Sequence, residues 1–358
     1  HPHHCGCVGQ WHADGDRGDQ ARDAAPFVII AHARDDRVTG VWPLQGERHL
    51  GCLFAVVLGE PFSQYADILI AEDADEDAII YAFLEALRSL GRFSGVVLRK
   101  VRQDAICRPY IAEDAMIFGE GAAPAVDLRP FEDFDAYHRT IKSKTRKNLR
   151  NARNRLMRDG SGASGAGGDV THRVHRDPEA IAEVAHRAFR LRADFLAQRG
   201  ETSRAFLDTG FSSFVAQLCT CAEVLGLTLV AFELTCGDQM VSLQWGFIDR
   251  GRYYAFIAVR NPAFDAHSPG RLHLEDVLRS AASQGIEVVD FLAPEMDYKK
   301  TWASEAVGVQ DHGLAFTPGG RLALVGAFGA PRRWAQAAFG ALPSDFRRSA
   351  LRLLTRRS

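Results

Sequence analysis

The sequence predicts an α+β fold (mixed α/β) made of two domains. Short apolar, β-branched runs alternate with segments in which apolar residues recur every three or four positions, as expected for strands and helices. The 358 residues suit two domains of about 150 residues each. We expect a disordered leader over 1–25, a first domain over 26–130, a basic helix and Gly-rich linker over 131–168, a second domain over 169–317 and a basic amphipathic tail over 318–358.

The composition excludes several classes of protein. Hydrophobic residues make up 46% of the chain and charged residues 25%, which is ordinary for a soluble globular protein. The 43 Lys and Arg against 45 Asp and Glu leave a net charge of −2, which argues against a chain basic throughout for nucleic acid. No apolar run approaches the roughly 18 residues of a membrane span, and no signal peptide is seen. Seven cysteines without a framework spacing predict reduced thiols in a cytosolic protein.

The first domain begins after a leader of unusual composition. Residues 1–25 are polar and rich in Gly and Asp, and such a composition cannot pack a core. A soft-metal site on its Cys and His residues is the alternative to disorder. Four strands should follow, over 27–31, 38–44, 53–58 and 66–70. Asp75 then caps a helix that Gly91 closes, and a strand spans 96–99.

A long basic helix is predicted from about Glu132 to Arg158. Its apolar stripe should be buried, whereas nine cations occupy the other faces: Arg139, Lys142, Lys144, Arg146, Lys147, Arg150, Arg153, Arg155 and Arg158. These cations are either a solvated face or a surface for a polyanionic cofactor or an acidic glycan. Nucleic acid is disfavoured, because residues 139–158 contain no aromatic side chain on which a base could stack.

The second domain should begin with a strand over 170–174. A helix capped by Asp177 follows and ends at Gly200, and another begins at the Thr202-Ser203 cap. The remaining elements are an antiparallel meander, a helix and a last strand, with the strands over 227–234, 240–248, 253–259 and 286–292 and the helix ending at Gly285.

The start of the last helix has the features of a phosphate-binding turn. A strand leads through a loop into Ser268-Pro269-Gly270-Arg271, where free backbone N–H groups and the helix dipole point the same way. Ser268 can cap the helix, Pro269 presets its first turn, and Gly270 lets a ligand approach the backbone. Pro and Gly at a helix start also have a purely structural explanation.

Three groups of residues resemble one family of acetyltransferases. The segments Ser268-Pro269-Gly270-Arg271-Leu272 and Val289-Asp290-Phe291-Leu292, followed by Asp297-Tyr298-Lys299-Lys300-Thr301-Trp302, are similar to the "SPG…DFL…YK..W" pattern of GNAT-fold proteins of the cellulose and exopolysaccharide biosynthesis type. The stretch over 143–150 is similar to the basic helix of that family. The resemblance extends over about 130–305. It relates the chain to the Fem-type peptidyltransferases, which pair two GNAT domains.

The resemblance implies a tandem GNAT-like fold, with a first domain that lacks its leading helices and is incomplete. It also implies transfer of an acyl group from acyl-CoA, with acetyl-CoA as the expected co-substrate, to an amine or hydroxyl, with no metal. The cofactor pyrophosphate would bind at Ser268, Pro269, Gly270 and Arg271. The acyl arm would lie between two splayed strands, over 253–259 and 287–292.

The same resemblance singles out three catalytic candidates and one core residue. Asp290 is either the base for the attacking amine or a structural cap of the following turn. Tyr298 either returns a proton to the departing thiolate or packs its ring. Lys299 either contacts the acceptor or the developing charge, or is a surface lysine; both readings predict that Lys299→Met changes stability by less than about 0.5 kcal/mol. Trp302 should lie in the core with its N–H satisfied.

We therefore expect an acyl-CoA-dependent acyltransferase of polysaccharide or envelope metabolism, acting on a small-molecule or glycan acceptor. A Fem-like aminoacyl-tRNA-dependent transferase and a non-catalytic scaffold are the alternatives. The tail over 318–358 contains eight Arg and one acid among apolar residues. It either lies on the inner face of an anionic membrane or docks on the protein itself. The expected location is cytoplasmic.

Overall fold

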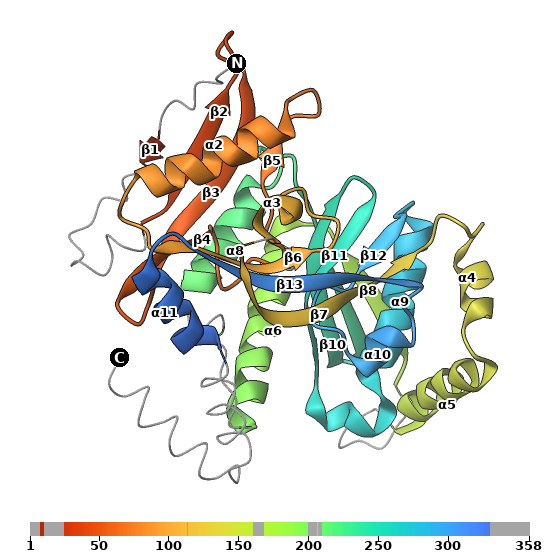
Figure 1. The fold of residues 1–358 in the computed structure, drawn as a ribbon. Helices are drawn as coiled ribbons and strands as arrows, with labels where there is room; N and C mark the ends of the chain where they lie inside the picture. The colour runs from red at the N-terminus through yellow and green to blue at the C-terminus, as the bar shows by residue number, and fades with distance from the viewer. Residues whose placement is uncertain are drawn as a thin grey trace. The chain divides into compact units, whose positions relative to one another are not determined.

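The computed structural model describes residues 8–10, 25–112, 114–159, 168–199, 206 and 210–329. The chain divides into two compact units (Figure 1). The first takes its residues from 1–122 and 307–343, and the second from 123–306 and 344–358. Each unit combines a mixed sheet with helices, so the α+β fold class predicted from the sequence is confirmed.

The first unit is built on a sheet with the strand order β1-β2-β3-β4-β6-β13, and β5 pairs with β3. Its neighbouring strands are antiparallel except β4 and β6, which are parallel. The strands are β1 (Val8–Gln10), β2 (Phe27–His32), β3 (Val38–His49), β4 (Cys52–Val57), β5 (Leu69–Ile70), β6 (Gly95–Arg102) and β13 (Glu305–Ala315).

Helices cover both faces of this sheet. Successive side chains of β4 point to opposite faces, so this strand contributes to two hydrophobic cores. On one face, α2 (Glu76–Ser89) buries Phe83 against Trp42 in the larger core. On the other face, α11 (Pro318–Phe328) packs against Phe54. As predicted, the Asp75 side chain caps α2 by accepting a hydrogen bond from the Ala78 N–H. A short helix, α3 (Arg108–Ala112), follows β6.

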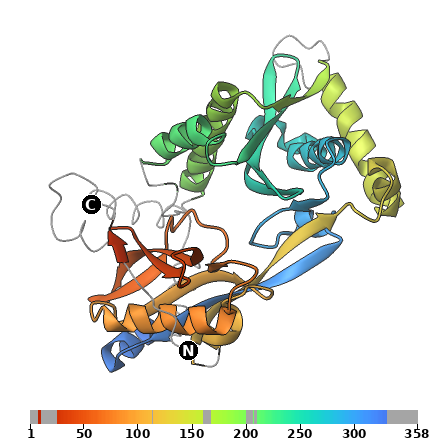
Figure 2. The same ribbon diagram turned by 90° about the horizontal axis from the view of Figure 1, so that it is seen from above.

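The second unit has the strand order β7-β12-β11-β10-β9-β8, and only β11 and β12 are parallel. One face is covered by α6 and α8 and the other by α9 (Figure 2). The strands are β7 (Met116–Asp127), β8 (Val170–His175), β9 (Thr228–Cys236), β10 (Gln239–Asp249), β11 (Arg252–Arg260) and β12 (Val288–Asp290). The helices are α4 (Phe134–Thr140), α5 (Ser143–Asp159), α6 (Pro178–Gln198), α8 (Gly210–Cys221), η2 (Pro262–His267), α9 (Pro269–Ser283) and α10 (Asp297–Lys300).

The two units repeat one order of elements. In the first, the antiparallel strands β2, β3 and β4 precede α2, and β6 then pairs parallel to β4. In the second, the antiparallel strands β9, β10 and β11 precede α9, and β12 then pairs parallel to β11. Both parallel pairings extend over three residues of each strand. The tandem arrangement predicted from the sequence is therefore present in the chain's topology.

The predicted helix over 132–158 is two helices, α4 and α5. The chain between them is extended at Ile141, whose ψ is 136° and whose side chain is buried. The carbonyl of Ile141 accepts a hydrogen bond from the Arg146 side chain, at 3.0 Å from its Nε, so the break is held from within α5. The stripe predicted to be buried does line the core, at Leu149, Ala152 and Leu156.

Several boundaries differ from the prediction. The strand expected over 66–70 is shortened to β5, and the one over 286–292 to β12. The second domain was expected to reach residue 317, but β13 pairs with β6 and belongs to the first unit from Val307 onward. The structure therefore places α11, the start of the predicted tail, in the first unit.

Two predicted segments lie largely outside the described residues. Of the leader over 1–25, Val8–Gln10 form β1 and pair with β2. Residues 330–358 of the tail are not among the described residues, and neither are 200–205 with the Thr202-Ser203 cap. In the described ranges, no helix is long and apolar enough to cross a membrane. The five cysteines found there are unpaired, as predicted: Cys52, Cys107, Cys219, Cys221 and Cys236.

Candidate active site

The site predicted from the sequence lies where β11 and β12 part. The two strands pair only over Arg252–Tyr254 and Val288–Asp290. Beyond Tyr254, β11 continues to Arg260 with β10 as its partner, whereas β12 has ended. Among the described residues, one edge of β11 therefore has no strand partner from Ala255 onward, as the splayed strands predicted from the sequence require.

A β-bulge accompanies this opening. Trp245 of β10 pairs with Ile257, but the next residue, Gly246, pairs with Ala255, so Phe256 is the extra residue of β11. Such a bulge bends its strand and increases the local twist. A Cβ atom at Gly246 would lie 1.9 Å from the carbonyl oxygen of Tyr254, so only glycine fits here. The bulge explains physically why β11 diverges from β12 after Tyr254.

The predicted phosphate-binding turn lies at the N-terminus of α9. Ser268 has a left-handed conformation (φ 54°, ψ 50°), and its side chain makes no capping hydrogen bond, so the predicted Ser268 cap is wrong. Its carbonyl instead accepts from the N–H groups of Arg271 and Leu272, at 3.1 and 3.3 Å. Pro269 begins the helix as predicted. Around Gly270, nothing lies within 4 Å of an added Cβ, so the backbone there is open to a ligand.

Arg271 supplies a second reason to expect an anion at this turn. Its Nε atom is buried and has no hydrogen-bond partner in the described part of the chain. A buried donor without an acceptor is costly, and a phosphate oxygen would satisfy it. An open helix N-terminus together with an unsatisfied guanidinium donor fits the pyrophosphate of CoA. The helix itself is fixed to the sheet by His273, whose Nδ1 lies 2.9 Å from the hydroxyl of Ser242.

Asp290 has the structural role that the sequence left open as its second reading. Its side chain is almost fully buried. One carboxylate oxygen accepts the Leu292 N–H at 2.9 Å, and the other lies 3.3 Å from a guanidinium nitrogen of Arg252. Leu292 has a left-handed φ of 58°, so Asp290 caps a turn that strains a non-glycine residue.

The structure contradicts the surface reading of Lys299, one of the two readings that the sequence left open. Its side chain is buried, and its ammonium group donates to three carbonyl oxygens, those of Phe291, Leu292 and Pro294, at 2.8–2.9 Å. Burial lowers the pKa of Lys299 to about 8, against the opposing charge of Asp290. All three ammonium protons are therefore used inside the protein near neutral pH.

Tyr298 keeps its hydroxyl available for chemistry. The ring is partly buried and packs on the core of the second unit. Burial raises the pKa of Tyr298, whereas the charges of Arg192 and Arg260 oppose the rise. The phenol is thus a neutral donor, and its hydroxyl has no hydrogen-bond partner among the described residues.

Trp302 is a core residue, as predicted, with 1% of its surface exposed. The prediction that its N–H is satisfied is wrong, because the indole nitrogen has no hydrogen-bond partner within the described ranges. The backbone carbonyl of Trp302 accepts a hydrogen bond from the hydroxyl of Tyr137, and its ring stacks on His138 at 6.0 Å. These contacts hold the segment after α10 on α4.

Sequence reasoning missed the arginines of α6 and β11 beside Tyr298. The guanidinium carbons of Arg192, Arg199 and Arg260 lie 5.7, 5.4 and 5.4 Å from the centre of the Phe195 ring. Arg192 and Phe195 of α6 and its C-cap residue Arg199 are three and four residues apart, which places them on one helix face. This spacing was readable from the sequence, but the contribution of β11 was not.

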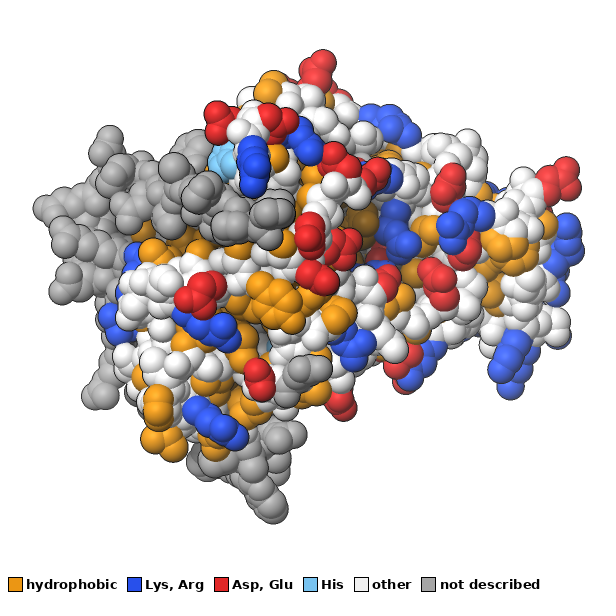
Figure 3. All heavy atoms as spheres, turned by 45° about the horizontal axis from the view of Figure 1, so that its top comes forward, with side chains coloured by type: hydrophobic (Ala, Val, Ile, Leu, Met, Phe, Trp, Pro, Cys, Tyr) orange, Lys and Arg blue, Asp and Glu red, His pale blue; other side chains and the backbone are white. Residues whose placement is uncertain are grey.

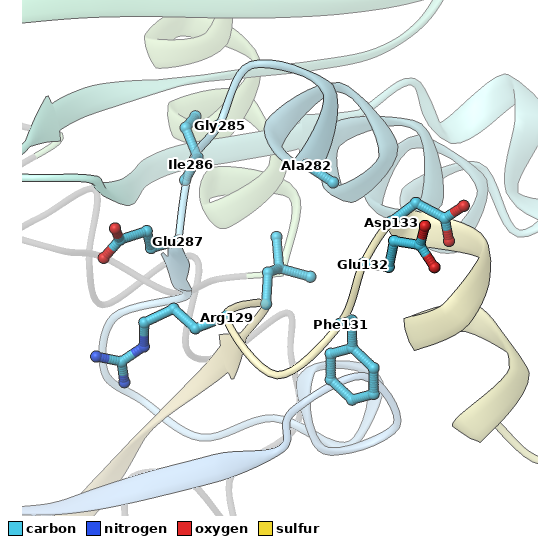
Figure 4. A pocket seen from close by; sticks show the side chains of 9 residues that line it. Arg129, Phe131, Glu132, Asp133, Ala282, Gly285, Ile286 and Glu287 are labelled. Carbon is cyan, nitrogen blue, oxygen red and sulfur yellow. The ribbon is translucent and has the colours of Figure 1, made fainter.

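A small pocket lies at the other end of α9. Its volume is about 170 Å³. It is lined by residues that follow β7 and by the C-terminal end of α9 and the segment after it: Leu128, Arg129, Phe131, Glu132, Asp133, Ala282, Gly285, Ile286 and Glu287. Arg129 and Glu287 lie on one side of it, and Glu132 and Asp133 on the other (Figure 4). None of the site residues predicted from the sequence lines it.

The charges of the basic segment are only partly neutralised. Arg153 pairs with Asp276 at 2.7 Å, Arg158 pairs with Asp159, and Arg146 donates to a backbone carbonyl. The other six predicted cations are exposed and pair with no acid of the described residues: Arg139, Lys142, Lys144, Lys147, Arg150 and Arg155. On the face seen in Figure 3, acidic and basic side chains are interspersed. Within the described ranges, no group of His, Cys, Asp and Glu could hold a metal.

A comparison with known protein families matches part of the second unit. Residues 143–300 match the family described as acetyltransferase (GNAT) domain. The matched range lies in the second unit and contains β11, α9 and β12, the elements that build the site. The second unit therefore contains a GNAT domain, the fold of an acyltransferase. No curated protein matches the sequence.

Solved structures are similar to this chain at low sequence identity. A conserved protein of unknown function from Bacteroides thetaiotaomicron has a TM-score of 0.50 at 12% identity, over 80% of this chain and 86% of that one. L-PGS from Bacillus licheniformis has a TM-score of 0.49 at 13% identity, over 85% and 87%. A tandem GNAT protein from the clavulanic acid biosynthesis pathway has 0.43 at 13%, over 83% and 84%.

Proposed function

We propose that the protein transfers an acyl group from acyl-CoA to an amine or hydroxyl of an acceptor. One observation carries the proposal: β11, whose edge has no strand partner among the described residues from Ala255 onward, leads through η2 to the open N-terminus of α9, where Arg271 has a buried donor that no described residue satisfies. An acyl-CoA has the matching shape, since its pyrophosphate suits the helix N-terminus and its extended pantetheine amides can pair with a strand edge.

When bound, acyl-CoA supplies a thioester whose carbonyl carbon the acceptor attacks. A backbone N–H on the open edge of β11 would stabilise the negative charge on the carbonyl oxygen. The C–S bond breaks as the new C–N or C–O bond forms, and Tyr298 would donate its hydroxyl proton to the departing thiolate. The acceptor loses one proton to solvent, and Tyr298 regains one from solvent. Asp290 is left out as base, because both of its oxygens are engaged.

The first unit is not expected to bind a second CoA. The helix that corresponds to α9 there is α2, whose first turn carries Glu76 and Asp77. The Asp75 carboxylate already accepts the Ala78 N–H. Three carboxylates at a helix N-terminus repel a pyrophosphate, so the acyl-CoA site is proposed for the second unit alone.

The acyl-CoA proposal is tested by calorimetric titration and by melting shifts with acetyl-CoA, longer acyl-CoAs and charged tRNA. Binding of a CoA thioester supports it. Stabilisation by charged tRNA alone would favour the Fem-like alternative, and no response to either would favour a non-catalytic scaffold. We disfavour the Fem-like reading because the stretch over 200–226 leaves little room for the inserted helical arm of those enzymes.

We further propose that the acceptor belongs to polysaccharide or envelope metabolism, with acetyl as the acyl group. The support is the family resemblance and the exposed cations of α5, which suit an acidic glycan. Heparin serves as the probe of that surface. Changing Lys144, Lys147, Arg150 and Arg155 to Gln should abolish salt-sensitive heparin binding, whereas changing Arg34, Arg173, Arg190 and Arg321 to Gln should not. Equal losses would assign the binding to net charge.

A further inference from the structure

A cluster of guanidinium groups surrounds one aromatic ring in the second unit. Phe195 of α6 has the guanidinium carbons of Arg192, Arg199 and Arg260 within 5.7 Å of its ring centre. The ring attracts cations to its faces and restricts where they sit. Three positive groups therefore share a small volume between α6 and the end of β11, although like charges repel one another.

These arginines differ in how far their charge is neutralised. Arg260 forms a two-point ion pair with Asp265, at 2.6 and 3.2 Å. Arg192 is half-buried and has neither an ion pair nor a hydrogen bond to any described residue. A guanidinium group that is partly removed from water and has no acidic partner is unfavourable unless an anionic ligand supplies the opposite charge.

Arg192 shares the Phe195 ring with Arg260, the last residue of β11, and the edge of β11 opens at the proposed active site. Its charge acts on both Tyr298 and Lys299: it opposes the rise in the pKa of Tyr298 and adds to the lowering of the pKa of Lys299. The hydroxyl of Tyr298 has no hydrogen-bond partner among the described residues. Lys299 cannot take the same part, because three carbonyls hold its ammonium group.

We propose that Arg192, braced by Phe195, binds an anionic group of the acyl acceptor, so that the acceptor is an amine or alcohol carrying a carboxylate or a phosphate. The planar guanidinium can hold either anion through two parallel hydrogen bonds. That the bound anion belongs to the acyl acceptor rests on the proposed acyltransferase function. The cofactor phosphates have their own cation in Arg271, at the N-terminus of α9.

The test uses probe pairs that differ only in the anion. Glucosamine 6-phosphate is compared with glucosamine, and glycine with glycinamide, in calorimetric titrations with CoA present and in turnover with acetyl-CoA. Arg192→Gln removes the cation. Arg190→Gln is the matched control, because Arg190 is exposed on the same helix and has no ion pair with a described residue. A melting curve verifies that each variant is folded.

The wild type and Arg190→Gln should bind one anionic probe at least about tenfold more tightly than its neutral partner, and Arg192→Gln should reduce that preference to less than about twofold. The probe pair that shows the effect identifies phosphate or carboxylate. No preference in the wild type, or an equal loss for neutral and anionic probes in Arg192→Gln, would overturn the proposal. Probe binding that needs Arg192 but gives no acetyl transfer would instead retain the anion site and reject the proposed function.

Discussion

Lys299 shows how far burial changes the role of a single residue. Its three hydrogen bonds fix the carbonyls of Phe291, Leu292 and Pro294. Phe291 and Leu292 belong to the turn that Asp290 caps, and Leu292 has a left-handed φ. The ammonium group therefore stabilises the segment that joins β12 to α10, and with it the position of Tyr298.

We predict that Lys299→Met lowers the free energy of unfolding by about 3 kcal/mol, since it leaves three buried carbonyl oxygens unsatisfied. Denaturant titration measures the change. Lys300→Met is the control, because Lys300 is half-exposed and pairs only with Glu295 at the surface; its change should stay below about 0.5 kcal/mol. Equal stabilities for the two variants would favour the surface reading, one of the two that the sequence left open for Lys299.

A substitution at Gly270 tests ligand binding without disturbing the fold. Nothing lies within 4 Å of an added Cβ, and its backbone is not in the left-handed region, so the helix accepts a side chain. We predict that Gly270→Glu folds with unchanged stability, within about 1 kcal/mol, because an acid suits a helix N-terminus. Affinity for CoA should fall by about two orders of magnitude, since the carboxylate repels the pyrophosphate. Unchanged affinity in calorimetry would move the cofactor away from residues 268–271.

At the scale of elements, the bulge in β11 depends on one glycine of β10. We predict that Gly246→Ala destabilises the protein by about 3 kcal/mol, because the new methyl would lie 1.9 Å from the Tyr254 carbonyl oxygen. Gly270→Ala, with open space around it, should cost less than about 0.5 kcal/mol. Thermal unfolding of both variants measures the difference, and a tolerated Gly246→Ala would show that the strand can repack without the bulge.

Elements that depend on local pattern were predictable, and those that depend on distant pairing were not. The cap of α2 at Asp75 and the meander of β9, β10 and β11 follow from capping and turn residues next to apolar runs. By contrast, β7 contains Gly119, Gly121 and Pro124, and these residues predict a loop at a place where the structure has a strand. β13 alternates weakly and is stabilised by β6, about 200 residues earlier in the chain.

The same limit explains what the sequence missed in the site. The phosphate-binding turn is contiguous, so Ser268, Pro269, Gly270 and Arg271 were found together. The cluster at Phe195 joins α6 to β11, and no local spacing connects them. The burial of Lys299 likewise depends on how the chain turns after β12, which the pattern of a short polar helix does not reveal.

At the scale of the whole molecule, one order of elements occurs twice, but the two helix N-termini differ in charge. In α9 the first turn carries Arg271 and no acid. In α2 it carries Glu76 and Asp77 behind the Asp75 cap. Since the pyrophosphate is the most highly charged part of CoA, the helix terminus decides which unit can bind it.

We therefore predict that one CoA binds per chain despite the repeated topology. Calorimetry should give a stoichiometry of one, and hydrogen exchange with CoA present should slow in α9 and β11 while α2 keeps its rate. At a CoA concentration of 100 times Kd, ligand binding should add about 2.7 kcal/mol to the free energy of unfolding of the part that binds it. Protection confined to α2, or a stoichiometry of two, would show that the acids of the first unit do not exclude the cofactor. Gly270→Glu serves as the control in both measurements, since it should remove binding and protection together if the single site lies at α9.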